Sequence, residues 1–307
     1  MQVIGYDKKH EEKKSEKESL IHVVRFMGGL GNQLFQYGLY KTFEELGYPT
    51  YADTKELRDG SYFRNYQLEF LGIHVLEADK RIIRELYGLD NKILRAIIKR
   101  VGKKTYIRQR KLIFDSSIMD PKSGYFDGYW QSYKYFENYA SVVKNSIHFP
   151  TFNVLDENGA IYYDQIMNSP EAVSVHVRLG DSDELQEVYG GICTFDYYKK
   201  SMDYISNELT KKGKASPIFF VFSNDIDRAK KLFDRNDMVY VSGNSEDQGY
   251  IDMNLMHCCH HHIIANSSFS WWGAFLGEKE DSITVAPKKW IAGVGSEDIV
   301  PPNWIKI

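Results

Sequence analysis

The sequence has little cysteine, no long apolar run and no strong excess of charge. Of its 307 residues only three are cysteine, and two of these, Cys258 and Cys259, are adjacent. So few cysteines form no disulfide framework, which favours a reducing compartment such as the cytoplasm. The formal net charge is −3, so nucleic acid is not an expected partner. No apolar stretch reaches the roughly 18 residues of a membrane-spanning helix, and no signal-peptide core is expected at the start.

The chain is instead rich in aromatic residues and begins with a mixed-charge segment. It contains 22 Tyr, 17 Phe and 5 Trp, and most of these rings are expected to lie in the core. Residues 1–19 include the run DKKHEEKKSEKES and are expected to be a disordered leader. The remaining length suits two moderate domains. We place them at residues 20–165 and 166–307, with the C-terminal end packing back on the first domain.

Strands and helices alternate along the sequence, most regularly in its second half. A strand over 20–26 is followed by a glycine turn and a helix over 32–46, whereas residues 50–150 are harder to interpret. Later strands are predicted at 172–178, 217–223, 238–242, 262–266 and 282–287, with helices at 194–213, 225–233, 247–259 and 269–277 between them. This alternation predicts an α/β fold with a parallel sheet whose strands all end at one edge.

Polar residues follow several of these strands, at the edge where ligands bind in open α/β sheets. The strand EAVSVHVRLGD carries valines on one face and His176 and Arg178 on the other. A buried arginine needs an anionic partner, and a nucleotide diphosphate supplies one bidentately. The alternative interpretation is a surface ion pair beside a core histidine.

Three further motifs suit either ligand binding or ordinary helix starts. MGGLGNQ offers an anion site at a helix N-terminus or a tight turn with Asn32 as N-cap; it matches neither a Walker A loop nor a G-x-G-x-x-G fingerprint. FSNDID suits a nucleoside contact or a helix cap by Ser223 or Asn224. IIANSSFSWWGAF suits a phosphate site, with both tryptophans packed in the core. Thr194 or Asp196 is expected to cap the helix over 194–213.

The run HCCHHH at 257–262 has histidines at helical spacing but is not predicted to bind metal. It contains no Cys-x-x-Cys pair and no glutamate between paired histidines, and known zinc sites have such patterns. The two cysteines are expected to be buried at a helix end. The interpretation is therefore structural.

Together the motifs resemble the bacterial inverting α1,2-fucosyltransferases, which share a superfamily with α1,6- and protein O-fucosyltransferases. The resemblance rests on GGLGNQLFQYG, HVRLGD, GICTFDYYKKSMDYI, FSND, DMNLMHCCHHHIIANSSFSWWGAFLG, VAPKKW and PPNWIKI, and it extends over nearly the whole chain after residue 20. It implies a GT-B-like architecture of two Rossmann-like domains facing across a cleft. The C-terminal domain would bind GDP-β-L-fucose and the N-terminal domain the acceptor.

The resemblance also implies an activity. The chain would be a galactoside α1,2-fucosyltransferase that moves L-fucose to the 2-hydroxyl of a terminal galactose, with inversion and without metal or other cofactor. The acceptor would be a galactose-terminated oligosaccharide or a lipid-linked glycan of polysaccharide synthesis. This implies a cytoplasmic enzyme, with peripheral contact at the inner membrane face as a further option. Another GDP-sugar transferase or hydrolase, or an inactive binding homologue, are the alternatives.

Site residues carry over from the same resemblance. Arg178 would stabilise the leaving GDP, with His176 beside it. Position, and not the resemblance, makes Asp181 the first choice as general base, ahead of Glu184 and Glu187, because it closes the motif at the strand edge; the alternative is that it only orients Arg178 or the loop. Asp252 would read guanine, and Asn32 would reach the donor across the cleft. The full donor-binding set is Gly29, Gly31, Asn32, Gln33, Ser223, Asn224, Asp225, Asp252, Asn266, Ser267, Ser268 and Phe269. The chain departs from the family at Asn224, where an aspartate is usual, and in the loop after Arg178.

Overall fold

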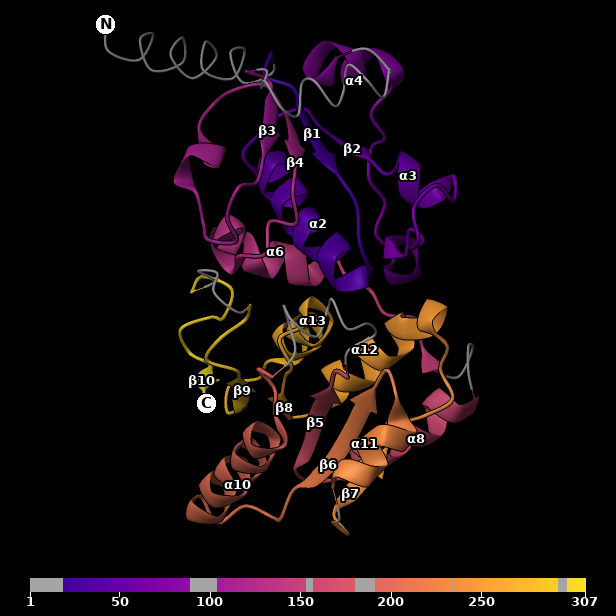
Figure 1. Cartoon of the computed structure of the whole chain (residues 1–307), viewed down its shortest axis with the longest axis vertical. Helices are drawn as coiled ribbons and strands as arrows, with labels where there is room; N and C mark the ends of the chain where they lie inside the picture. The colour runs from indigo at the N-terminus through magenta and orange to yellow at the C-terminus, as the bar shows by residue number, and fades with distance from the viewer. Residues whose placement is uncertain (1–18, 89–103, 153–156, 180–190, 234, 292–296) are drawn as a thin grey trace, which may run out of the picture. The chain divides into compact units, whose positions relative to one another are not determined.

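The structure, a computed structural model, describes residues 19–88, 104–152, 157–179, 191–233, 235–291 and 297–307. These residues form two compact units, each built around its own parallel sheet (Figure 1). The first unit comprises the described residues up to Glu69 and those from Ile73 to Ile147, and the second comprises Phe70–Gly72 and His148–Ile307. The α/β class with two Rossmann-like units is thereby confirmed.

The first unit contains a four-stranded sheet in the order β2-β1-β4-β3, with every pair parallel. Its strands are β1 (His22–Arg25), β2 (Thr50–Asp53), β3 (Tyr106–Arg108) and β4 (Gly124–Asp127). Its helices are α2 (Leu30–Glu45), α3 (Lys55–Arg58), α4 (Lys80–Tyr87) and α6 (Ala140–Asn145), with short turns of 3-10 helix at η2 (Ser116–Met119), η3 (Tyr133–Tyr135) and η4 (Glu137–Tyr139). A further short turn, η1 (Leu68–Leu71), lies where the chain passes into the second unit.

The second unit contains a six-stranded parallel sheet in the order β10-β9-β8-β5-β6-β7. Its strands are β5 (Ala172–Val177), β6 (Ile218–Ser223), β7 (Met238–Tyr240), β8 (His261–Ile263), β9 (Thr284–Ala286) and β10 (Ile305–Lys306). Its helices are α8 (Glu157–Asn168), α10 (Phe195–Lys211), α11 (Ile226–Leu232), η5 (Glu246–Gln248), α12 (Gly249–Cys258) and α13 (Ser268–Gly277). The alternation predicted from residue 172 onward is confirmed.

Core packing in the second unit follows the predicted faces. Val173, Val175 and Val177 of β5 are fully buried in one apolar cluster, as period-two alternation requires. Trp271 and Trp272 of α13 are also fully buried, so their assignment to the core is confirmed. Thr194 caps α10, since its hydroxyl accepts a hydrogen bond from the Tyr197 amide at 3.3 Å.

Two expected helix caps are wrong. Asn32 is not the N-cap of the first helix, because α2 already begins at Leu30 and Gly29 occupies the cap position. Neither Ser223 nor Asn224 caps α11; Asp225 does so, through a carboxylate that accepts from the Arg228 amide at 3.0 Å. In both motifs several adjacent residues are good N-caps. The residue at which the helix begins decides which of them is the cap, and residue preferences alone do not predict it.

Several expectations about the ends and boundaries keep their status as predictions. The leader at 1–19 lies outside the described residues except for Ser19. The domain boundary between residues 165 and 166 also stays a prediction. The compact units of the structure describe how its residues pack, and they do not show which parts of the chain fold independently. Among the described helices, none is both long and apolar enough to cross a membrane.

Three histidines are buried without charge in the folded chain. Burial lowers the pKa of His22 to about 4 and that of His176 and His262 to about 3. His22 lies among the rings of Phe43, Tyr48 and Phe126 at centroid distances of 4.4, 4.5 and 5.4 Å. Because protonation would place a cation in these apolar surroundings, the fold excludes the protonated forms.

Stability should therefore fall in mild acid. An unfolded histidine binds a proton near pH 6.5, so this stabilisation is complete above that pH and is lost as the pH falls toward the folded values, at up to about 1.4 kcal/mol per pH unit for each histidine. Urea unfolding at pH 7.5, 6 and 5 measures how steeply the free energy of unfolding falls with pH. His22→Phe fits the aromatic surroundings and should make this fall less steep, whereas replacing the exposed His74 by Phe should leave it unchanged. Equal slopes in both variants would contradict this account.

Candidate functional site

The strand order of the second unit identifies one point on its sheet edge. From β5 the chain builds outward through β6 and β7 and then returns to the other side of β5 for β8. The order therefore reverses between β5 and β8, whose connections leave in opposite directions. In open α/β sheets the ligand binds outside the carboxyl ends of the strands at such a switch point. The residues after Val177 and Ile263 are consequently the first candidates.

Arg178 directly follows β5 at this switch point. The sequence suggested a buried arginine, and this is wrong, because β5 ends at Val177 and Arg178 is exposed. Only the strand before it is fully buried. The guanidinium can therefore meet an anionic ligand without the desolvation cost of a core position.

The main chain just beyond Arg178 is held by Asn224, which follows β6. The Asn224 Oδ1 accepts from the Leu179 amide at 2.9 Å, and its Nδ2 donates to the Leu179 carbonyl at 2.8 Å. A side-chain amide can donate and accept at once, whereas a carboxylate only accepts. This pairing explains why an asparagine serves at a position where the resembled family has an aspartate.

On the other side of the switch point the chain turns from β8 into α13. Ser267 is the N-cap but makes no side-chain cap bond, and the helix begins at Ser268. Helix N-termini of this kind attract anions through their N–H groups and the helix dipole. Asn266 is tied into the protein, since its Nδ2 donates to the Trp290 carbonyl at 3.1 Å and its Oδ1 accepts from the Cys193 thiol at 3.4 Å.

His176 lies one residue before the end of β5 and contacts the start of α13. Its ring lies 5.7 Å from that of Phe269. Burial and the neighbouring Arg178 cation lower its pKa to about 3, so the ring is neutral at physiological pH. Its Nδ1 is buried and has no hydrogen-bond partner among the described residues. His176 therefore shapes the site as a neutral group and cannot add positive charge for a ligand.

The nucleoside-binding residues predicted from the sequence form hydrogen bonds within the protein. Asp252 lies in the first turn of α12, and its Oδ1 accepts from the Asn244 Nδ2 at 2.6 Å. Ser223 and Asp225 serve the β6–α11 turn, where the Ser223 hydroxyl accepts from the Asp225 amide at 3.1 Å. Asn244 is not among the site residues predicted from the sequence, and no local pattern pointed to its contact with Asp252.

The remaining predicted donor-binding residues belong to the first unit. Gly29 caps α2 and Gly31 lies in its first turn, while the Asn32 Oδ1 accepts from the Gln131 Nε2 at 2.6 Å. Gln33 is fully buried and donates to the Gly28 and Asn65 carbonyls, both at 2.9 Å. Gln33 therefore holds the glycine turn together, and the donor-binding role of all four residues stays a prediction. Nothing in the motif pointed to Gln131, which lies 99 residues away from Asn32.

Asp181, Glu184 and Glu187 lie outside the described residues, so the choice of base stays a prediction. No group of three or more metal-ligating side chains occurs in the described part of the chain, and the metal-free reaction likewise stays a prediction.

In the HCCHHH run, His260 pairs with Asp281 at 2.6 Å and His261 with Glu171 at 2.9 Å. Cys259 is fully buried, as expected, while Cys258 is partly exposed.

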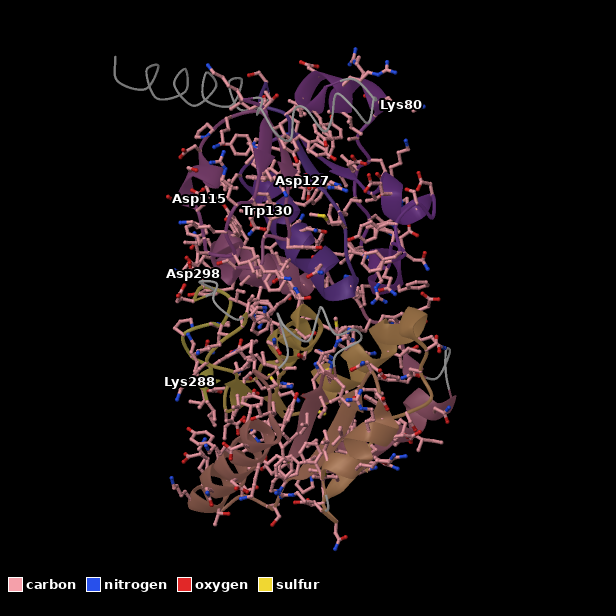
Figure 2. The ribbon with its side chains drawn as sticks, viewed as in Figure 1. Lys80, Asp115, Asp127, Trp130, Lys288 and Asp298 are labelled. Atoms are coloured by element: carbon pink, nitrogen blue, oxygen red, sulfur yellow. The ribbon has the colours of Figure 1, made fainter. Side chains whose placement is uncertain are left out.

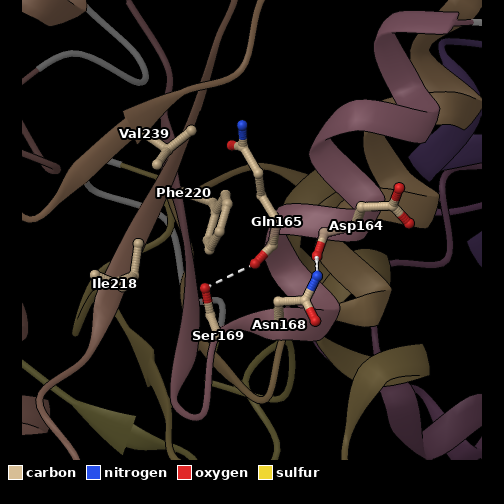
Figure 3. Close-up of a pocket in the computed structure, with 7 residues that line it drawn as sticks. All are labelled: Asp164, Gln165, Asn168, Ser169, Ile218, Phe220 and Val239. Atoms are coloured by element: carbon tan, nitrogen blue, oxygen red, sulfur yellow. Dashed lines mark hydrogen bonds between the residues drawn. The ribbon is translucent and has the colours of Figure 1, made fainter.

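A hollow of about 500 Å³ lies elsewhere in the second unit, between α8 and strands β6 and β7 (Figure 3). Two of its polar side chains already bond to α8, since the Asn168 Nδ2 donates to the Asp164 carbonyl and the Ser169 hydroxyl to the Gln165 carbonyl, each at 2.8 Å. Its wall includes Ile218, the first residue of β6. The hollow thus lies away from the carboxyl edge and does not compete with the switch point.

The strand order and polar carboxyl edge define a doubly wound α/β protein of the kind that binds nucleotides at its switch point. The sequence matches the family described as glycosyl transferase family 11 over residues 4–307. The chain belongs to this family and is a glycosyltransferase.

Full-length relatives agree with this assignment. The chain is 33% identical over 306 residues to an alpha-1,2-colitosyltransferase of Escherichia coli, covering 94% of this chain and 99% of the relative. It is 28% identical over 310 residues to the O-antigen biosynthesis glycosyltransferase WbnK of Escherichia coli, covering 91% and 98%. A solved structure of the fucosyltransferase NodZ from Bradyrhizobium aligns with a TM-score of 0.47 at 13% identity, covering 84% of this chain and 92% of that one.

A substitution at Asn224 tests whether its amide positions the main chain next to Arg178. In Asn224→Asp the donated bond to the Leu179 carbonyl is replaced by repulsion between two acceptors, at a cost of about 1–2 kcal/mol, so glycosyl transfer should fall roughly tenfold. Steady-state kinetics and hydrogen exchange at Leu179 measure the effect. The matched control is Asn168→Asp, because that exposed amide also donates to a backbone carbonyl at 2.8 Å, but within α8. If both variants kept wild-type transfer rates, Asn224 would have no positioning role.

Proposed function

We propose that this protein is a galactoside α1,2-fucosyltransferase, which transfers L-fucose from GDP-β-L-fucose to the 2-hydroxyl of a terminal galactose with inversion. The observation that carries the proposal is that Arg178 follows β5 and α13 begins after the neighbouring strand β8, so that both lie at the switch point. These are complementary to a sugar diphosphate. Membership of family 11 supports sugar transfer, and the α1,2 linkage is supported by the name of the 33% identical relative.

The proposed reaction breaks the bond between fucose C1 and the β-phosphate oxygen as the acceptor oxygen attacks C1 from the opposite face. Negative charge then grows on the leaving GDP. Arg178 and the N–H groups at the start of α13, from Ser267 and Ser268 onward, neutralise it. Fixed donors of this kind act strongly because they need no reorganisation as the charge develops. No metal ion is required in this scheme.

The other residues bind and orient. Asp252, already hydrogen-bonded by Asn244, accepts from the guanine edge, and Ser223, Asn224 and Asp225 line the nucleoside side. Neutral His176 keeps the space beside Arg178 free of a competing cation. The proton of the acceptor hydroxyl goes to a carboxylate, for which Asp181 is our first choice.

Removing the guanidinium tests the proposal. Arg178→Ala should lower transfer by about 10²–10³-fold and leave folding unchanged, because the side chain is exposed. Arg178→Lys should also fail, since a point charge cannot bind a phosphate bidentately. The assay follows fucosylated lactose from GDP-fucose in the presence of a chelator, with Arg84→Ala on α4 as the exposed control. Substantial transfer by Arg178→Ala would contradict the proposal, and free fucose without transfer would indicate a hydrolase.

A second candidate differs only in the donor sugar. The relative named as a colitosyltransferase is 33% identical over nearly the full length, and colitose is L-fucose without its 3-hydroxyl. A pocket built to hydrogen-bond that hydroxyl rejects the deoxy sugar strongly, because its polar groups would be left unpaired. We therefore expect kcat/KM for GDP-fucose to exceed that for GDP-colitose by at least about tenfold. The reverse order in a side-by-side assay would assign the colitosyl activity.

A further inference from the structure

An ion-paired cluster lies at the carboxyl edge of the sheet in the first unit. Arg25, the last residue of β1, pairs with Asp127 at 2.9 Å and with Glu56 at 2.5 Å. Asp127, the last residue of β4 and labelled in Figure 2, also accepts from the Tyr106 hydroxyl. Burial alone would lower the pKa of Arg25, but Asp127, Tyr125 and Glu56 together raise it above its ordinary value. The guanidinium is therefore a permanent cation that holds both carboxylates in place.

The topology places this cluster at a switch point of its own. The sheet order β2-β1-β4-β3 means that the chain leaves β1 for β2 on one side and later returns to the other side with β4. The carboxyl ends of β1 and β4 are Arg25 and Asp127. The fold rule that locates ligands at switch points applies here independently of the site in the second unit.

Two aromatic rings extend the cluster to the surface. Tyr62 and Phe63 stack at a centroid distance of 4.6 Å, and Phe63 is 78% exposed. Burial, with Tyr129 beside the ring, raises the pKa of Tyr62 to about 12; the Arg25 charge and a backbone hydrogen bond with Gly28 act against that shift. The Tyr62 amide also donates to the Glu56 carbonyl at 3.0 Å, so Tyr62 links the exposed Phe63 to the ion-paired cluster.

The loop that carries Tyr129 is fixed from behind. The Gln109 Oε1 accepts from the Tyr129 and Trp130 amides at 2.8 and 2.9 Å. Trp130, labelled in Figure 2, is fully buried with a φ of 54°. Gln109 therefore holds the loop after β4 in place, and a surface that is ordered in advance loses less entropy when it binds a ligand.

We propose that this edge binds a pyranose ring of the acceptor glycan, with Tyr62 and Phe63 packing against the apolar face of the sugar and Glu56 accepting from its hydroxyls. The inference rests on the proposed function. Core stabilisation accounts for the buried Arg25–Asp127 pair, but it does not account for the side chain of Glu56, which is 43% exposed. Nor does it account for an exposed phenylalanine beside the same edge. Aromatic rings joined to fixed carboxylates match the two kinds of surface on a neutral sugar.

The test separates acceptor binding from donor chemistry. Phe63→Ala and Glu56→Gln should each raise the KM for lactose about tenfold, with kcat, GDP affinity by calorimetry and hydrolysis of GDP-fucose without acceptor unchanged. Glu69→Gln is the matched control, because Glu69 is an exposed carboxylate of the same unit that pairs with Arg58 at 2.8 Å. An unchanged lactose KM in Phe63→Ala and Glu56→Gln would overturn the inference.

Failure of the proposed function gives a different pattern. If the wild-type protein binds no GDP and transfers no fucose, the function is wrong, and the acceptor surface is judged by binding alone. Saturation-transfer NMR with lactose provides that measurement. Lactose signals that disappear in Phe63→Ala and persist in Glu69→Gln would support the sugar-binding surface, whereas signals that persist in both variants, or are absent from the wild type, would overturn it.

Discussion

The pairing of β5 with β8 is the interaction on which the candidate site depends. These strands are nearly ninety residues apart, yet they pair in parallel through Val173↔His261, Ser174↔His262 and Val175↔Ile263. Without this pairing the sheet would have no switch point, and Arg178 and the start of α13 would not share an edge. The register is specified by polar contacts as well as by apolar burial. The Ser174 hydroxyl bonds the His262 Nδ1 at 2.9 Å, and Glu171 pairs with His261 at 2.9 Å at the opposite end of the strands. A slip by one residue would reverse every side chain and bury these groups unpaired.

The two units use one topological rule for different chemistry. In the second unit the switch point carries an exposed cation and a helix N-terminus, which suit a charged diphosphate. In the first unit Arg25 is already neutralised by Asp127 and Glu56, and Asp127 is buried, so the edge presents the Glu56 carboxylate and aromatic rings. An anion would be repelled there, whereas a sugar hydroxyl can donate to a carboxylate. The division of labour that we propose for the two units thus rests on the ion pairs of Arg25 and on the exposed position of Arg178.

The sequence was most informative where periodicity was long and least informative where contacts were distant. The strand over 172–178 and the helix over 194–213 were predictable because alternation and a threonine cap gave consistent signals. Strands β2, β3 and β10 were missed, although β7, β8 and β9 have only three residues each. Those three were found because they lie in the regular alternation of strands and helices, which residues 50–150 and the C-terminal end do not show. The exposed position of Arg178 was also missed, because alternation cannot show at which residue a strand ends. The partners of Asn32 and Asp252 come from other elements, and no local pattern encodes them.

Asn224 holds the main chain beside the exposed Arg178, since its one amide satisfies both polar groups of Leu179, the residue after Arg178. In the proposed function the backbone at Arg178 is therefore in position before a ligand arrives, and a site that is ordered in advance loses less entropy on binding. A carboxylate at position 224 could hold the Leu179 amide but would repel its carbonyl, so the choice of asparagine is what fixes the chain on both sides.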